Sequence, residues 1–184
     1  MTLPKLYNPL SGYLKDRFKC RVCKVTIDTG LSCPNRDGTK GVGGCDYCVS
    51  SVLLPKALAS GTDVKSQLDE GIAYVRGRHN AEKFIAYFQV NTSTHAPLEE
   101  LEKLFRAALI PEVACVAVST RPDSLGDGVI SLLSEIKKEK PLWVELGLQS
   151  ANDATLERVN RGHTAAEFKD AVIRAAAAGI DICA

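Results

Sequence analysis

Short apolar segments rich in β-branched residues alternate with longer helical segments along most of the chain, and this alternation restricts the fold more than any other feature. The run Ala114–Val118 is apolar at every position, as strands are when both faces of their sheet are covered. Repeated units of a strand followed by a helix predict a parallel sheet in an α/β protein. A TIM-type barrel and a doubly wound sheet both satisfy the pattern.

The pattern predicts the positions of the individual elements. Strands are expected over Lys24–Asp28, Phe84–Gln89, Val113–Thr120, Leu142–Gln149 and Ile180–Ala184. Helices are expected over Asp63–Arg78, Leu98–Ala108, Asp127–Lys138, Asn152–Val159 and Ala165–Ala178. The last helix is the clearest, because Thr164 and Glu167 have capping-box spacing and Gly179 follows its end.

Polar residues follow the carboxyl end of each predicted strand, at 29–33, 89–94, 119–123 and 149–150. In a barrel, working residues collect at these ends. A doubly wound dinucleotide site would instead need a Gly-x-Gly-x-x-Gly turn after the first strand, which this sequence lacks. We therefore predict a partial (β/α) TIM-type barrel of about four βα units plus a fifth strand.

Composition narrows the class of protein. The 184 residues are 45% hydrophobic and carry a net charge of +1, which predicts one globular domain without an all-basic surface. The longest uncharged stretch, 84–98, has 15 residues and is too short to span a bilayer. No hydrophobic signal segment follows Met1. We expect a soluble, cytoplasmic protein with no membrane contact.

Seven cysteines are the unusual part of the composition, and five of them fall within 29 residues. Their odd number, their crowding and the missing export signal disfavour disulfides and favour a metal or redox role. Cys33, Cys45 and Cys48 lie in one loop, with eleven and then two residues between them. Three thiolates suit a cubane iron–sulfur cluster that lacks a fourth protein ligand. An iron left open in this way can bind the amino and carboxylate groups of S-adenosylmethionine, and Tyr47 can cover that cofactor.

A zinc ribbon is the alternative interpretation. Cys20-x2-Cys23 and Cys45-x2-Cys48 are separated by 21 residues, which is close to zinc-ribbon spacing and would suit a nucleic-acid-binding module. This reading leaves Cys33 unused and places an apolar strand between the two pairs. Cys20 and Cys23 are otherwise plain thiols near the first strand.

The loop and its flanks resemble radical S-adenosylmethionine (radical SAM) enzymes. The full string from Lys24 to Cys48 resembles a bacterial subfamily named after the YhcC and YtqA proteins, which is related to the catalytic subunit of the elongator complex. The resemblance continues through the strings Ala86-Tyr-Phe-Gln89, Ser119-Thr-Arg-Pro-Asp123, Trp143-Val-Glu-Leu-Gly-Leu-Gln-Ser150 and Asn160-Arg-Gly-His-Thr164. It covers nearly all of the chain, although Cys20-x2-Cys23 is not part of the subfamily pattern.

The resemblance implies roles for individual residues. Cys33, Cys45 and Cys48 would ligate a [4Fe–4S] cluster. The segment after the second strand, with Gln89, Asn91 and Thr92, would lie near the methionine moiety of S-adenosylmethionine. The residues expected to contact the cofactor's ribose and carboxylate are Glu145, Gln149 and Ser150, and those expected on the cofactor or substrate side are Arg161 and His163.

The resemblance also implies an activity and partners. The protein would cleave S-adenosylmethionine to a 5′-deoxyadenosyl radical, with electrons from a reductant protein such as flavodoxin or ferredoxin. The substrate is unknown, and the elongator relatives suggest a tRNA wobble uridine. The first 24 residues carry six Lys or Arg against one acid, with Tyr7, Tyr13 and Phe18 interleaved. This composition suits either an RNA-binding segment or a solvated arm.

Two domain expectations follow: a basic arm over 1–23 and the partial barrel over 24–184. The chain stops as the fifth strand begins, without the family's glycine-rich stretch after that strand. We therefore expect a fragment or truncated form of a longer protein that self-associates when it is made alone.

Overall fold

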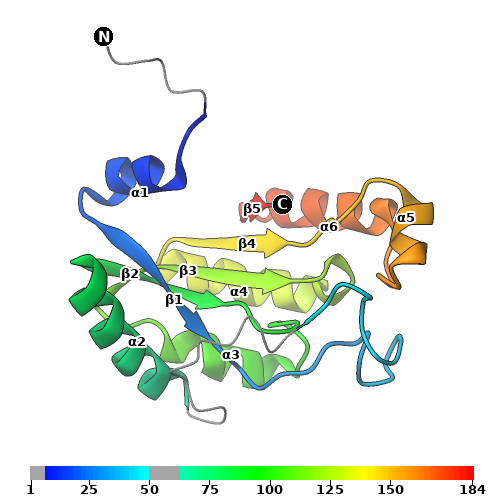
Figure 1. Ribbon diagram of the computed structural model, residues 1–184, viewed down its shortest axis with the longest axis horizontal. Helices are drawn as coiled ribbons and strands as arrows, with labels where there is room; N and C mark the ends of the chain where they lie inside the picture. The colour runs from blue at the N-terminus through cyan, green and yellow to red at the C-terminus, as the bar shows by residue number, and fades with distance from the viewer. Residues whose placement is uncertain (1–6, 50–62) are drawn as a thin grey trace.

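The computed structural model describes residues 7–49 and 63–184, and its described strands form one parallel sheet (Figure 1). The strands are β1 (Val22–Ile27), β2 (Lys83–Phe88), β3 (Val113–Thr120), β4 (Leu142–Leu146) and β5 (Asp181–Cys183). Their order in the sheet is β1-β2-β3-β4-β5, and each neighbouring pair is parallel. A doubly wound sheet reverses its strand order at a switch point, whereas a barrel wall follows chain order. The predicted partial TIM-type barrel is confirmed.

One described helix precedes β1, and the others lie between consecutive strands. The helices are α1 (Leu10–Phe18), α2 (Val64–His79), α3 (Leu98–Ala107), α4 (Asp127–Glu139), α5 (Asp153–Arg158) and α6 (Ala165–Ala177), with a short 3₁₀ turn η2 (Pro122–Ser124) after β3. The predicted capping box of α6 is present, and Asn152 caps α5 by accepting from the Thr155 N–H. None of these described helices is long and apolar enough to cross a membrane.

The main core lies between one face of the sheet and helices α2, α3, α4 and α6. Leu68 of α2, Leu101 of α3 and Leu133 of α4 are fully buried there against the strands. Phe88 of β2 and Phe105 of α3 meet edge to face, with ring centroids 5.1 Å apart. This core fixes the strands from the side that becomes the outside of a barrel.

The opposite face of the sheet carries α1, which Figure 1 shows apart from α2 and α3. Leu14 of α1 is buried in a second, smaller cluster with Ile85 of β2 and Cys115 of β3. Residues 10–18 of the expected basic arm therefore form a helix packed on the sheet, and residues 1–6 lie outside the described part of the chain. The sequence did not indicate this helix, because Leu14 is its one buried residue and a single apolar position gives no helical period.

Two strand boundaries differ from the predictions by more than one residue. β1 begins at Val22 instead of Lys24, because Val22 already pairs with Lys83 of β2. β4 ends at Leu146 instead of Gln149, and Gln149 has a left-handed φ of 67° that no strand accommodates. The chain therefore leaves the strand after Leu146, and Gly147 and Gln149 lie in the segment that follows the carboxyl end of β4.

Candidate functional site

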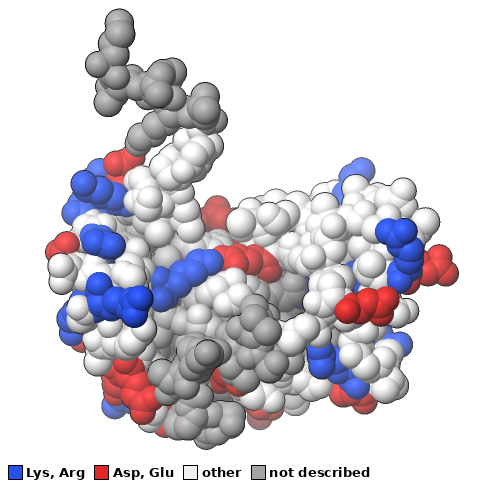
Figure 2. Space-filling view, in the orientation of Figure 1, with Lys and Arg blue, Asp and Glu red and all other residues white. Residues whose placement is uncertain are grey.

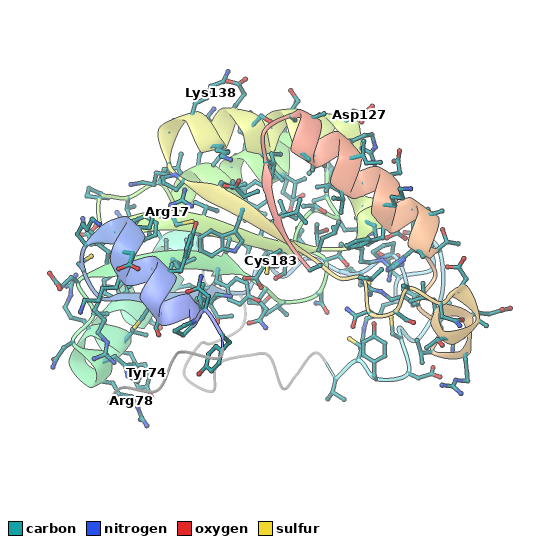
Figure 3. The ribbon with its side chains drawn as sticks, turned by 90° about the horizontal axis from the view of Figure 1, so that it is seen from above. Arg17, Tyr74, Arg78, Asp127, Lys138 and Cys183 are labelled. Carbon is teal, nitrogen blue, oxygen red and sulfur yellow. The ribbon has the colours of Figure 1, made fainter. Side chains whose placement is uncertain are left out.

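A cavity of about 340 Å³ opens at the carboxyl ends of the five strands. Segments that follow every strand contribute to it, as barrel sites require. Its lining residues are Cys33, Arg36, Gly44, Cys45, Tyr47, Cys48, Tyr87, Gln89, Asn91, Thr92, Ser119, Thr120, Arg121, Glu145, Leu146, Gly147, Gln149, Arg161, Cys183 and Ala184. Figure 3 labels Cys183, at the end of β5. The three predicted cluster ligands, Cys33, Cys45 and Cys48, thus line the same cavity.

The cysteine loop after β1 is folded by its own backbone and anchored by the linker between α5 and α6. The Cys48 N–H donates to the Cys45 carbonyl at 2.9 Å, and Gly43 and Gly44 have φ angles of 87° and 88° that favour glycine. The Asn35 amide donates to the Asn160 carbonyl at 2.5 Å. The Asn160-to-Thr164 string thus holds the loop from 125 residues away in the chain.

Arg161 reaches from that linker to the buried Cys45. Its Nη1 lies 3.7 Å from the Cys45 Sγ, its Nε donates to the His163 Nε2 at 2.8 Å and its Nη2 donates to the Gly147 carbonyl at 3.0 Å. Burial alone would raise the pKa of the Cys45 thiol, but hydrogen bonds and charge from Arg161 outweigh burial and lower it. The guanidinium therefore favours the thiolate, which is the form that binds metal.

Gly147 permits this approach of Arg161. A Cβ at Gly147 would lie 2.7 Å from the Arg161 Nη2 and 2.8 Å from the Gln149 Nε2. Any side chain there would push Arg161 away from Gly147 and Cys45. The Gly147 position therefore connects the end of β4 to the cysteine loop.

Glu145 of β4 lines the cavity, but its carboxylate already accepts hydrogen bonds from three other side chains. Lys24 Nζ donates to Oε1 at 2.5 Å, Trp143 Nε1 to Oε1 at 3.2 Å and the Tyr87 hydroxyl to Oε2 at 2.6 Å. Burial and the hydrogen bond to Glu145 raise the pKa of Tyr87 to about 12, so the phenol stays protonated. Glu145 thus forms a polar floor to the cavity on the face of the sheet that carries α1.

The other predicted cofactor residues divide into two groups. Tyr47, Gln89, Asn91, Thr92, Gln149 and Arg161 line the cavity. Ser150 is not among the lining residues, and its hydroxyl accepts from the Asn152 N–H at the start of α5. Their proposed contacts with a cofactor stay predictions.

The sequence analysis gives no individual role to Arg36, Tyr87, Ser119 and Arg121, although all four line the cavity. Tyr87 and Arg121 stand in strings that carried the resemblance, and that position was the available signal. From the sequence alone, an Arg–Asp pair in a turn stiffened by Pro122 is an equally good explanation of Arg121. Arg121 is 2% exposed and makes a bidentate pair with Asp123, at 2.9 Å and 2.8 Å.

The donor set fits a [4Fe–4S] cluster better than a single ion. The described residues contain no group of three or more His, Cys, Asp or Glu placed to hold one metal ion. Three thiols around one cavity suit a cluster, which is several atoms across. Cys20 packs beside the α1 cluster and Cys23 beside the main core, on opposite faces of the sheet. The four-cysteine zinc alternative is therefore not supported, because the two thiols pack in different clusters on the two sides of the sheet.

The Radical SAM superfamily model matches residues 33–184. The chain belongs to the radical SAM superfamily. It is 38% identical over 186 aligned residues to protein YhcC of Escherichia coli (strain K12) and 36% identical over 180 to the uncharacterized protein YtqA of Bacillus subtilis (strain 168). These alignments cover 100% and 97% of this chain, but only 59% and 56% of those proteins.

Solved radical SAM structures share the fold. Elp3 of the archaeon Methanocaldococcus infernus, with residues 1–46 deleted, aligns with a TM-score of 0.55 at 16% identity, over 88% of this chain and 36% of that one. The cobalamin-dependent S-adenosylmethionine radical enzyme OxsB, with aqua-cobalamin and S-adenosylmethionine bound, aligns with a TM-score of 0.56 at 16% identity, over 85% of this chain and 22% of that one. At this identity the likeness concerns the fold alone.

Proposed function

We propose that the cavity holds a [4Fe–4S] cluster on Cys33, Cys45 and Cys48 together with S-adenosylmethionine, and that the protein cleaves this cofactor reductively. The observation that carries the proposal is the placement of three thiols on one loop at the carboxyl ends of a radical SAM barrel wall. When bound, the cluster supplies a low-potential electron and an open iron site.

The chain's own residues would bind and orient the cofactor. Gln89, Asn91 and Thr92 lie at the end of β2 for the methionine moiety, and Gln149 lies beyond β4 for the ribose and carboxylate. Tyr47 is 48% exposed at the cavity mouth, where its ring would exclude water. Glu145 would act mainly through Tyr87 and Lys24, because its oxygens already accept from both.

The direct test is reductive cleavage. Protein reconstituted with iron and sulfide under anaerobic conditions is mixed with S-adenosylmethionine and dithionite, and 5′-deoxyadenosine is measured by chromatography. We expect product from this chain and none from Cys45→Ala. A reconstituted cluster with four irons that yields no 5′-deoxyadenosine, with or without RNA, would refute the activity.

For the substrate we propose a tRNA wobble uridine, and for the electron source a flavodoxin- or ferredoxin-type reductant. A group of exposed basic residues supports the proposal of an RNA substrate: Lys15, Arg17, Lys19, Arg21, Arg76, Arg78 and Lys83. Figure 2 shows basic side chains gathered where α1 and the start of β1 lie, and Figure 3 shows Arg17 and Arg78 on this side. This basic side is at the amino ends of the strands. A ligand that contacts it and the cavity must span about 20 Å, which a folded RNA does and a free nucleoside does not.

Binding of unmodified tRNA tests the substrate class. The triple variant R17Q/K19Q/R21Q should bind more weakly and lower the slope of log affinity against log salt by about 0.7–0.9 for each phosphate that the variant no longer neutralises. The triple variant K103Q/K138Q/K169Q is the matched control, because it removes three exposed lysines from α3, α4 and α6. Equally weakened binding in the two variants, or a salt slope near zero in the parent chain, would count against an RNA substrate.

A further inference from the structure

Three guanidinium groups from three segments of the chain line the cavity that holds the cysteines. Arg36, within the loop, donates to the Cys48 carbonyl at 2.8 Å. Arg161, in the α5–α6 linker, reaches the Cys45 Sγ at 3.7 Å. Arg121, at the end of β3, lines the same cavity. We call these three side chains the arginine ring.

Arg121 differs from Arg161 because one of its nitrogens is buried without a partner. Its Nε and Nη2 both donate to Asp123, at 2.9 Å and 2.8 Å. Its Nη1 is buried and has no hydrogen-bond partner among the residues that the structure describes. A buried donor left unpaired costs about 1–3 kcal/mol, so native proteins rarely keep one without a ligand to receive it.

A second orphaned group lies in the same cavity. The Thr92 Oγ1 is buried and also lacks a partner within the described residues. The Thr92 backbone N–H donates to the Ser32 carbonyl at 3.4 Å, which places Thr92 beside Cys33. Arg121, Thr92, Cys33 and Cys45 all line this one cavity. A hydrogen-bond acceptor held by the cysteines in this cavity would satisfy the Arg121 Nη1.

We infer that the Nη1 of Arg121 donates a hydrogen bond to a sulfur of the cluster held at Cys33 and Cys45, and that the arginine ring raises the reduction potential of this cluster. The inference rests on the proposed function, because it assigns residues to the cluster that the proposed function requires. Asp123 is then a positioning residue. Its carboxylate binds the Nε and Nη2 of Arg121 and so orients the unpaired Nη1 toward the cavity.

Charge arithmetic gives the direction of the effect. A [4Fe–4S]²⁺ core with three thiolates has a net charge of −1, and one electron from a low-potential donor such as dithionite makes it −2. No bond forms or breaks, and no proton moves. A nearby buried positive charge stabilises the −2 state more than the −1 state, because screening by water is weak there. Hydrogen bonds to cluster sulfurs act in the same direction.

The experiment is a redox titration of the cluster by EPR, without S-adenosylmethionine, in the parent chain and in R121Q, R121K and K40Q. K40Q is the matched control. Lys40 pairs with the same Asp123 carboxylate at 2.9 Å but does not line the cavity. We expect R121Q to lower the equilibrium constant for one-electron reduction at least tenfold, which is about 59 mV. R121K should give a smaller shift, and K40Q should stay within a factor of three of the parent.

The remaining outcomes also decide the inference. An unchanged potential in R121Q with four irons bound would overturn it, as would equal shifts in R121Q and K40Q. Should R121Q take up no iron, R121K decides: a cluster with a lowered potential supports the inference, whereas no cluster, or a cluster with the parent potential, overturns it. A parent chain that takes up no iron refutes the proposed function itself, so the two failures are distinguishable.

Discussion

At the scale of single residues, the most informative pair is Arg121 with Asp123. The side chain of Asp123 is 3% exposed, and Lys40 also contacts its carboxylate. Removing one partner of a buried ion pair leaves an uncompensated charge, so Asp123→Asn should lower the free energy of unfolding at pH 7 by about 3–5 kcal/mol. Glu102→Gln, which breaks the exposed pair with Arg106, should cost less than about 1 kcal/mol. The free energies of unfolding are measured by urea denaturation. Equal decreases in the two variants would contradict a stabilising role of the buried Arg121–Asp123 pair.

The same carboxyl predicts a pH dependence. Burial raises the pKa of Asp123, but hydrogen bonds from Arg121 and Lys40 outweigh burial and lower it below 3.8. A lowered folded-state pKa stabilises the protein above pH 3.8, and that contribution is lost as pH falls through the folded-state value. The stability difference between the parent chain and Asp123→Asn should therefore be constant above about pH 5 and shrink in acid. A constant difference down to pH 2 would show that Asp123 does not titrate in this way.

Gln149 and Ser150 are neighbours with different surroundings, and they make a matched test of the cofactor site. Gln149 lines the cavity, whereas the Ser150 hydroxyl accepts from the N–H of Asn152, the cap of α5. Gln149→Ala should weaken S-adenosylmethionine binding about three- to tenfold, the value of one hydrogen bond, without loss of iron. Ser150→Ala should leave both unchanged. Calorimetric titration of reconstituted protein gives the two affinities, and unchanged binding in Gln149→Ala would remove this residue from the site.

At the scale of elements, the contact between α2 and β1 is set by one glycine. A Cβ at Gly71 would lie 2.4 Å from the Val25 Cγ1, so either the buried Val25 side chain or the helix would have to shift. Gly71→Ala should therefore cost about 1–3 kcal/mol of unfolding free energy. Gly77 lies in the same helix with nothing within 4 Å of its would-be Cβ, so Gly77→Ala should stabilise the protein by up to about 1 kcal/mol. The two variants should therefore change the free energy of unfolding in opposite directions. Stabilisation by both would contradict the close contact between Gly71 and Val25.

Elements are also the scale at which the sequence was most informative. Periodicity located the five strands and α2 to α6, because buried strands and capped helices leave local patterns. It missed α1, whose packing depends on distant strands, and it extended β4 over Gln149, whose left-handed backbone has no local signal. The sequence placed Arg121 at the carboxyl end of a strand but gave no sign that its side chain is buried. Lys40 of the loop that follows β1 contacts its partner Asp123, and a local sequence pattern does not reveal such a distant contact.

At the scale of the whole molecule, the chain spans somewhat more than half of the length of its curated relatives. β1 and β5 are the edges of the described sheet, and neither has a second strand partner among the described residues. Open edges promote association between chains. We expect the 184-residue chain to self-associate in size-exclusion chromatography with light scattering. A stable monomer that cleaves S-adenosylmethionine as fast as a full-length relative would show that further strands are dispensable.

The most direct test of the whole account is the metal content and visible spectrum of protein purified without oxygen. The account predicts a brown protein with about four irons per chain after reconstitution and broad absorbance at about 400 nm. Cys33→Ala, Cys45→Ala and Cys48→Ala should each lose the colour, whereas Cys20→Ala and Cys23→Ala should keep it. A colourless protein that holds one zinc ion, and loses it in Cys20→Ala, would contradict the account.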